Sequence, residues 1–160
     1  MNTRARVVSA AVLVTATTLA ATRPAEIRVT PAEVDEMQAH DAGAGTSGVA
    51  GIRTTVVMGD PTQPGPYTIR LSVPAKTRIQ AHTHRDSRTA IVVAGTWYFG
   101  YGSVAGGATE KALPPGSFYT EPGGVAHFAE TKDGPVVVYI NGSGPTDTVY
   151  VDRGDDHSTK

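Results

Sequence analysis

Short runs of β-branched and aromatic residues recur along this chain from residue 52 onward, and a Gly or a Pro ends most of them. The runs come about every 10–12 residues, a spacing that is typical of an antiparallel sandwich or barrel. The 18 Gly and 11 Pro of the 160 residues are spread between these runs and are not gathered in one tail. This pattern argues against a helix bundle or a disordered chain and predicts an all-β domain.

The individual elements can be placed from the same pattern. A short helix is expected over residues 31–39, because Thr30 can cap it, Pro31 suits its first position and Glu33 completes a capping box. Residues 41–50 are rich in Gly, Ala and Ser and are expected to form a loop. Strands are expected over residues 52–58, 67–73, 77–84, 89–94, 96–101, 111–113, 117–120, 125–130, 136–140 and 146–151.

The first 21 residues have the pattern of a secretory signal peptide. Arg4 and Arg6 form a short basic segment, and an uncharged, mildly apolar stretch follows as far as Ala21. A membrane span needs roughly 20 apolar residues, so we expect cleavage near Ala20–Thr22 rather than an uncleaved anchor. The mature protein is then secreted or periplasmic, with no stable membrane span. We divide it into a helix and loop (22–50), a β-barrel (51–151) and a flexible charged tail (152–160) that carries His157.

Composition removes several classes of function. The formal net charge is −1, so the chain has no basic field with which to bind nucleic acid. It has no cysteine, which excludes disulfides, a thiol nucleophile and cysteine-based zinc sites. Any bound metal must therefore be held by His, Asp, Glu or other nitrogen and oxygen donors.

Three histidines stand out in the strand region. His82 and His84 are two residues apart on an expected strand, so their side chains point to the same face. His127 lies on another expected strand, after a Pro-Gly turn, and could complete a set of three imidazoles. Imidazole nitrogen suits Zn, Cu, Fe and Ni. If the three rings converge, the chain has a metal site inside a small β-barrel.

These histidines are part of a longer pattern that resembles the cupin superfamily. The second cupin motif is matched by Gly116, Pro122, Gly124 and His127, and the first by His82, His84 and Gly95. The sequence departs from the first motif at Lys76, where Gly is usual, and at Arg88, where a metal-binding Glu is usual. It departs from the second at Thr131, where Asn is common. The similarity looks closest to small single-domain exported bacterial cupins.

The resemblance implies a double-stranded β-helix, or jelly-roll, barrel over residues 51–151 with a short N-terminal helix before it. It also implies that His82, His84 and His127 bind a divalent transition metal, which could be Fe, Zn, Mn, Ni or Cu. Arg88 cannot coordinate a metal and would repel one if it pointed inward. Three-histidine iron cupins lack the Glu and still bind metal, and Asp86 or Glu121 could supply a carboxylate instead. In the remaining alternative, the histidines are polar wall residues of a metal-free barrel.

Other residues are candidates for contact with a substrate. By strand alternation, Gln80 shares the face of His82 and could orient a metal ligand or a bound water. Arg88 could hold the carboxylate of a substrate, and Tyr98 and Phe118 could line its pocket, as could Tyr101 and Phe128. Trp97 is expected either in the core or outside the barrel at a dimer interface. His40 is expected to end the helix, and Glu130 to face solvent.

Two functions follow from these residues, and the fold alone does not choose between them. The first is a metal-dependent enzyme that acts on a small organic molecule, such as a dioxygenase or an isomerase. The second is a non-catalytic barrel that captures or senses a small ligand or a metal ion, and a structural barrel with a degenerate site is the remaining alternative. Cupin barrels commonly pair through their sheets, so a homodimer is also expected.

Overall fold

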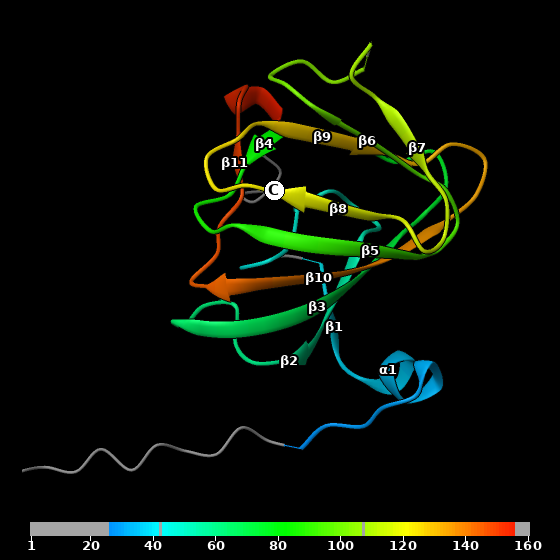
Figure 1. Cartoon of the computed structure of the whole chain (residues 1–160), viewed down its shortest axis with the longest axis vertical. Helices are drawn as coiled ribbons and strands as arrows, with labels where there is room; N and C mark the ends of the chain where they lie inside the picture. Colours follow the sequence, from blue (N-terminus) through cyan, green and yellow to red (C-terminus); the bar gives the residue numbers. More distant parts are fainter. Residues whose placement is uncertain (1–25, 42, 107, 156–160) are drawn as a thin grey trace, which may run out of the picture.

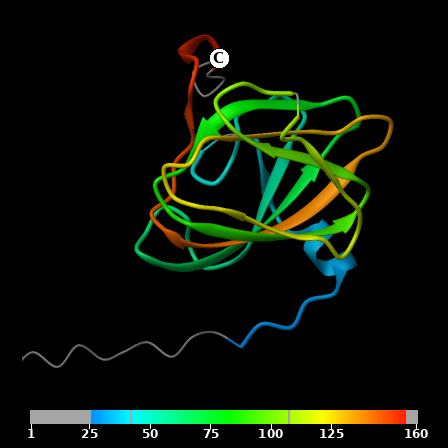
Figure 2. The same ribbon diagram turned by 45° about the horizontal axis from the view of Figure 1, so that its top comes forward.

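The structure, a computed structural model, describes residues 26–41, 43–106 and 108–155 (Figure 1). Two antiparallel sheets lie face to face and enclose the core, as the tilted view in Figure 2 shows. The elements, in chain order, are α1 (Pro31–Glu36), β1 (Ala39–His40), β2 (Arg53–Met58), β3 (Gly65–Val73), β4 (Arg78–Thr83), β5 (Arg88–Ala94), β6 (Trp97–Tyr101), β7 (Lys111–Leu113), β8 (Phe118–Glu121), β9 (His127–Glu130), β10 (Val136–Gly144), β11 (Val149–Tyr150) and a single 3-10 turn (Arg153–Asp155).

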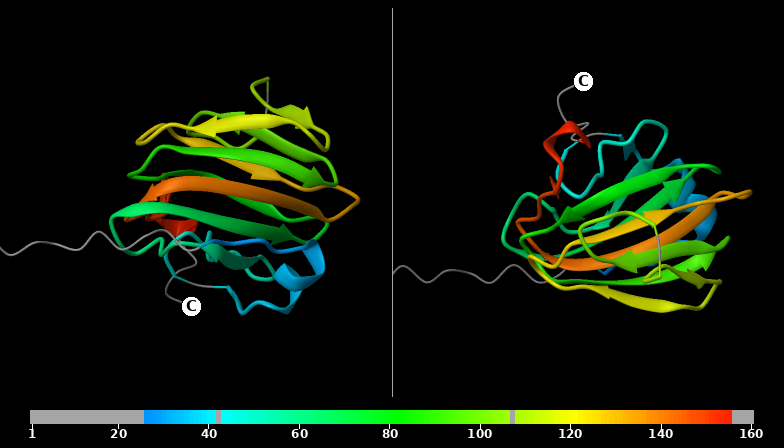
Figure 3. Two further views of the ribbon diagram at one scale, coloured as in Figure 1. Left: turned by 60° about the horizontal axis from the view of Figure 1, so that its bottom comes forward. Right: turned by 90° about the horizontal axis from the view of Figure 1, so that it is seen from above.

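The order of the strands is that of a jelly roll. The six-stranded sheet has the order β1-β2-β3-β10-β5-β8, and the five-stranded sheet has the order β11-β4-β9-β6-β7. Strands that follow one another along the chain, such as β3 and β4 or β8 and β9, lie in opposite sheets (Figure 3). The all-β jelly-roll prediction is therefore confirmed.

The core forms because the strands alternate between an inner and an outer face. In β3, Tyr67, Ile69, Leu71 and Val73 are buried, and the residues between them are only half-buried. β3 pairs along its whole length with β10, which contributes Val136, Val138 and Ile140 to the same core. Full burial of a side chain of this size stabilises the folded state by about 1.5–3 kcal/mol. The paired strands β3 and β10 therefore form the most apolar part of the core, and the histidines lie beyond it.

The short helix is present and ends earlier than the expected residue 39. The capping box is formed as predicted, since the Thr30 hydroxyl accepts from the Glu33 N–H and the Glu33 carboxylate accepts from the Thr30 N–H at 2.6 Å. Val34 is buried, and Asp35 forms an ion pair with Arg70 of β3. The helix is thereby fixed against the six-stranded sheet (Figure 3).

The strand predictions are confirmed in position, with small differences at the ends. Among the described residues, the one missed strand is β1, whose Ala39 and His40 pair with β2. The prediction that His40 ends the helix is wrong, because the backbone of Met37 is already extended and the chain leaves the helix there. The last expected strand, over residues 146–151, is reduced to β11.

Two departures from the cupin pattern, Lys76 and Thr131, are found at the turn between β3 and β4: Lys76 lies in the turn, and Thr131, which follows β9, contacts it. Lys76 has a φ of 57°, the left-handed region that favours glycine, which explains why Gly is usual at this position. Its N–H donates to the carbonyl of Lys132 at 2.8 Å. The Thr131 hydroxyl accepts from the N–H of Thr77 at 2.9 Å and donates to the carbonyl of Pro74. Lys76 and Thr131 therefore stabilise this turn and do not lie beside the three histidines.

The expected signal peptide (1–21) and His157 lie outside the described residues. Among the residues that are described, no helix is long and apolar enough to cross a membrane.

Candidate metal centre

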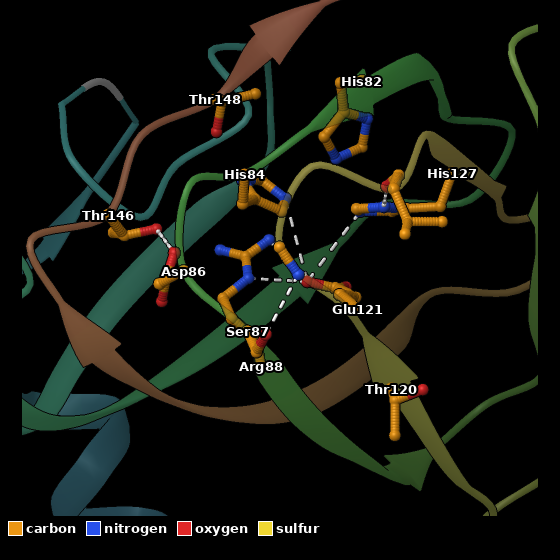
Figure 4. Close-up of polar contacts among 12 residues, drawn as sticks. His82, His84, Asp86, Ser87, Arg88, Thr120, Glu121, His127, Thr146 and Thr148 are labelled. Carbon is orange, nitrogen blue, oxygen red and sulfur yellow. Dashed lines mark hydrogen bonds and ion pairs between the residues drawn. The ribbon is translucent and has the colours of Figure 1, made fainter.

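The three predicted histidines meet at one end of the barrel. His82 lies on β4 directly opposite His127 on β9, and His84 follows β4 by one residue. Ring centroids are 4.8 Å apart for His82 and His84, 4.4 Å for His82 and His127, and 5.1 Å for His84 and His127. One ligand nitrogen from each ring lies within 4.8 Å of the others, and all three residues are buried. The rings therefore converge, as Figure 4 shows.

Main-chain carbonyls fix the orientation of every ring. The Nδ1 atoms of His82, His84 and His127 lie 2.7, 2.5 and 3.0 Å from the carbonyl oxygens of Gln80, Asp147 and Val125, respectively. A carbonyl can only accept, so each Nδ1 carries the hydrogen and each Nε2 is left with a lone pair. The Nε2 atoms of His84 and His127 are fully buried and have no hydrogen-bond partner among the described residues.

Burial keeps these imidazoles neutral. Desolvation is the main cause that lowers the pKa of His82, to about 3, and His127 lowers it further. Desolvation and the Arg88 cation lower the pKa of His84, and desolvation lowers that of His127. Neutral imidazole is the form that binds metal ions.

The three imidazoles fit a transition-metal ion. Buried polar atoms normally have a partner, and a metal would supply one for the two orphaned Nε2 atoms. Metal-binding histidines almost always donate their other ring nitrogen to a carbonyl or carboxylate, which is the arrangement of all three rings here. Three nitrogen donors leave further coordination positions open, as in catalytic sites and unlike closed structural zinc sites.

A carboxylate lies beside the histidines. Glu121 ends β8 directly opposite Arg88 on β5, and both are buried. Its Oε2 accepts from Arg88 Nε at 2.6 Å and lies 2.5 Å from Arg88 Nη2. The same oxygen is 3.7 Å from His84 Nε2 and 3.9 Å from His127 Nε2. Figure 4 shows Glu121 between the guanidinium and the imidazoles, so a metal ion held there would face a carboxylate before it faced Arg88.

Asp86, the other candidate carboxylate, is engaged elsewhere. Its Oδ2 accepts from the Tyr67 hydroxyl at 2.7 Å and its Oδ1 from the Thr146 hydroxyl at 2.5 Å. A side chain at Gly142 would place its Cβ 2.4 Å from the Tyr67 hydroxyl and 2.6 Å from Asp86, so this position has no room for one. Asp86 does not line the cavity that contains the histidines.

That cavity is narrow and mostly apolar. Its volume is about 30 Å³. Gly45, Thr46 and Ser47 of the N-terminal loop cover part of it, and the hydroxyls of Thr148 and Tyr150 donate to the carbonyls of Thr46 and Ser47 at 2.9 and 2.7 Å. Its walls are formed by Leu71, Ile79, Trp97, Phe99, Tyr119, Ala129 and Ile140, and its polar end by His82, His84, Arg88, Glu121 and His127.

The interpretation of Gln80 needs correction. The pairing of β4 with β9 slips between Ile79 and His82, so the strand has a β-bulge there. Alternation therefore breaks, and Ile79 rather than Gln80 lines the cavity with the histidines. Gln80 still contributes to the site through its main-chain carbonyl, which holds the ring of His82.

Two aromatic residues that were expected to line the pocket lie outside it. The structure places neither Tyr98 nor Phe118 in the cavity: Lys132 lies 3.8 Å from the centre of the Tyr98 ring, and Phe118 is 60% exposed. Trp97, in contrast, is in the core and lines the cavity.

Three further predictions concern side chains outside the cavity. Phe128 is buried against Gly100, whose missing side chain makes room for its ring. Tyr101 is exposed, and its hydroxyl donates to the carbonyl of Thr120. Glu130 is half-buried and pairs with Arg78.

Phe99 and Tyr119 line the cavity and were not predicted from the sequence. A signal for Tyr119 was present, because it lies two residues before Glu121 on a strand and therefore shares its face. The inward position of Phe99 could not be read in the same way, since β6 begins Trp97-Tyr98-Phe99 and has aromatic residues on both faces.

Comparison with known proteins supports the fold. No protein-family model matches the chain, and no curated protein matches it. Solved structures do match. They include the polyketide cyclase RemF from Streptomyces resistomycificus (TM-score 0.64, 13% identity, 84% of this chain and 91% of that one). A cupin 2 conserved barrel domain protein from Rhodopseudomonas palustris matches with a TM-score of 0.59 and 13% identity, over 81% and 87% of the two chains.

The DMSP lyase DddQ from Ruegeria pomeroyi DSS-3 also matches, with a TM-score of 0.56 and 16% identity over 78% of this chain and 68% of that one. At these identities the likeness concerns the fold and not the activity.

Proposed function

The chain has the cupin fold, and from that premise we propose that it is a metal-dependent enzyme that moves a proton on a small, oxygen-bearing organic molecule. The observation that carries the proposal is the set of three buried imidazoles. Their Nδ1 atoms are all held by carbonyls, and their ligand nitrogens converge within 4.8 Å. A site built only to fill the barrel would not leave two buried nitrogens without a partner.

His82, His84 and His127 would hold the metal. A bound divalent ion supplies Lewis-acid chemistry, which polarises a carbonyl or carboxylate oxygen. The chain contributes neutral imidazoles of fixed tautomer and a narrow, mostly apolar cavity that limits access by water. Electrostatic interactions are stronger in such a cavity than in water.

Glu121 is the residue that would accept the proton. Its Oε2 is the carboxylate oxygen nearest to the imidazole Nε2 atoms, at 3.7 and 3.9 Å, so a substrate that reaches the histidines also reaches this oxygen. Arg88 holds Oε2 through two of its nitrogens and compensates its buried charge. A carboxylate positioned in this way is suited to general-base catalysis.

The structural neighbours are compatible with this chemistry. Two of them are a lyase and a cyclase, so proteins with this fold include enzymes that act on small organic molecules. We also propose export, on the basis of residues 1–21. A homodimer is proposed on the basis of Ile91, Val93 and Phe118, which expose apolar side chains on β5 and β8 of the six-stranded sheet.

A dioxygenase is the second candidate. The favouring observation is that three imidazoles are present while Arg88 occupies the position of the usual metal-binding Glu. The resemblance associates this combination with three-histidine iron cupins. Oxygen uptake with thiols, diketones and catechols by the iron-loaded protein would support this candidate over the first.

The first test is elemental analysis of protein purified without chelator, which should give near one equivalent of a transition metal. The second test follows exchange of the C–H hydrogens next to the carbonyl of short-chain oxo acids in D₂O by NMR, with metal-loaded protein. Exchange should be fast with wild type and lost in His84→Ala, and Tyr98→Phe should behave as wild type. Substoichiometric metal in protein that cannot be reloaded would overturn the proposal.

A further inference from the structure

Four of the five buried polar atoms that lack a hydrogen-bond partner in the described residues belong to side chains that line the same cavity. Two are the acceptors already described, Nε2 of His84 and of His127. The other two are donors, the indole Nε1–H of Trp97 and the hydroxyl of Tyr119. Trp97 is 2% exposed and Tyr119 is 6% exposed, so neither group reaches bulk water.

The two donors are neighbours in the cavity. Desolvation and the Glu121 carboxylate raise the pKa of Tyr119 well above its ordinary value, while the Arg88 guanidinium and the Trp97 indole N–H lower it, so all three side chains lie near the Tyr119 hydroxyl. The contact between Trp97 and Tyr119 falls short of a full hydrogen bond, because both polar atoms are left without a partner. Phe99, which shares the inner face of β6 with Trp97, packs on Tyr119 with ring centroids 4.3 Å apart. It also stacks on His127, with centroids 5.5 Å apart and an interplanar angle of 28°.

Strand geometry relates these donors to the candidate metal site. Tyr119 and Glu121 are two residues apart on β8, so they share a face and their Cα atoms are about 6.6 Å apart along it. A molecule of a few non-hydrogen atoms can span such a distance. Such a molecule would contact the histidine end with one oxygen and the Trp97 and Tyr119 donors with another.

We infer that Trp97 and Tyr119 form an oxygen-binding subsite, so that the ligand of this barrel is a short molecule with two oxygen functions, such as a 2-oxo acid or a hydroxy acid. The inference rests on the proposed function, because the histidine end is assigned to a metal. A buried donor without an acceptor is costly, and a ligand oxygen removes that cost for both groups at once. Neither donor carries a charge, so the subsite suits an uncharged carbonyl, a hydroxyl or a single carboxylate oxygen.

The chain contains a built-in reporter for this subsite, since Trp97 is its one tryptophan. The full-length protein, loaded with zinc, is titrated with pyruvate, with lactate and with acetate, and tryptophan fluorescence is recorded. We expect a saturable change with pyruvate or lactate, and at least a tenfold weaker affinity in Tyr119→Phe. Tyr98→Phe, which removes a hydroxyl from a tyrosine outside the cavity, should bind as wild type does.

Zinc content separates the failure of this inference from the failure of the proposed function. If wild type and Tyr119→Phe both hold one zinc but bind the acids equally, the subsite inference is wrong and the metal site stands. The subsite inference is also wrong if none of the three acids changes the fluorescence of the zinc-loaded protein. If a buried water were the only partner of the Tyr119 hydroxyl, wild type and Tyr119→Phe would both hold one zinc and bind the acids equally. If wild type binds no zinc, the proposed function is wrong, and the subsite inference, which rests on it, is wrong as well.

Discussion

Two buried carboxylates, Glu121 and Asp86, lie near one another in the barrel and are used in opposite ways. Asp86 accepts hydrogen bonds from two hydroxyls, those of Tyr67 and Thr146, and lies outside the cavity. Glu121 is held by a single cation, Arg88, and faces nitrogens that have no partner. Sequence position alone did not distinguish them, since both were candidates for a missing metal ligand.

Burial alone therefore does not identify a functional group. Both side chains are less than a tenth exposed, at 9% for Asp86 and 4% for Glu121. The difference lies in what surrounds them: the hydroxyls around Asp86 complete its hydrogen bonds, whereas the atoms around Glu121 include unsatisfied ones. An incomplete hydrogen-bond set in a cavity indicates a ligand, and a complete set indicates a structural role.

Replacing Glu121 should have the largest effect. Glu121→Gln removes the nearest counter-charge of the buried Arg88, and we expect a loss of about 3–5 kcal/mol in the free energy of unfolding, together with loss of activity. Urea unfolding followed by circular dichroism measures the first. The double variant Arg88→Met/Glu121→Leu removes both charges and should regain most of the stability but none of the activity. A stable, active Glu121→Gln variant would contradict the role assigned to this residue.

Removing one imidazole should have the next largest effect. His84→Ala takes away one of three nitrogen donors, and we expect zinc affinity to fall by more than about 100-fold, the upper end of the cost of losing even an outer partner. Competition with a chromogenic chelator measures the affinity, and circular dichroism verifies the fold. Wild-type affinity in this variant would remove His84 from the site.

Asp86→Asn tests whether Asp86 stabilises the fold without taking part in the metal site. An amide offers one acceptor oxygen where the carboxylate offers two, so either Tyr67 or Thr146 loses its acceptor inside the barrel. We expect a loss of about 1–3 kcal/mol in the free energy of unfolding, measured in urea, with zinc affinity unchanged. A tenfold fall in zinc affinity in a folded variant would mean that Asp86 belongs to the metal site after all.

Tyr67→Phe should have the smallest effect, about 1 kcal/mol at neutral pH, since it removes one hydrogen bond to Asp86. The pH dependence of the free energy of unfolding is more informative than its value at neutral pH. Desolvation is the main cause that raises the pKa of Tyr67, from 10.0 to about 12. The folded state therefore favours the neutral phenol, so this stabilisation is complete below pH 10 and is lost as the pH rises toward 12.

The measurement is urea unfolding between pH 9 and 12 for both proteins. The stability of wild type should fall more steeply above pH 10 than that of Tyr67→Phe. Parallel curves for the two proteins would show that Tyr67 does not contribute.

Most of the fold and the three histidines could be predicted from the sequence because both depend on local pattern. Gly and Pro mark the turns, and strand alternation places His82 and His84 on one face. The pairing of His127 with them is a long-range fact, and it came from the cupin resemblance rather than from spacing. The same resemblance marked Lys76 and Arg88 as departures, and the structure gives a physical reason for the first in a φ of 57°.

The remaining site residues could not be predicted, for two reasons. Alternation fails across the bulge, so Gln80 was placed on the wrong face. It is also ambiguous where both faces of a strand are aromatic, as in Trp97-Tyr98-Phe99 and Phe118-Tyr119. Only the packing of one sheet on the other shows that Trp97 and Tyr119 point inward while Tyr98 and Phe118 do not.

The bulge in β4 has a consequence for any insertion or deletion near the site. This strand uses three steps from Ile79 to His82, where its partner β9 uses two from Ala129 to His127. Deleting one residue between Ile79 and His82 would give the two strands equal lengths over this stretch and would still leave all three histidines in the chain. It would also remove the irregular backbone whose carbonyl steadies the imidazole of His82. The length of this strand is therefore as much a requirement of the site as the identity of its ligands.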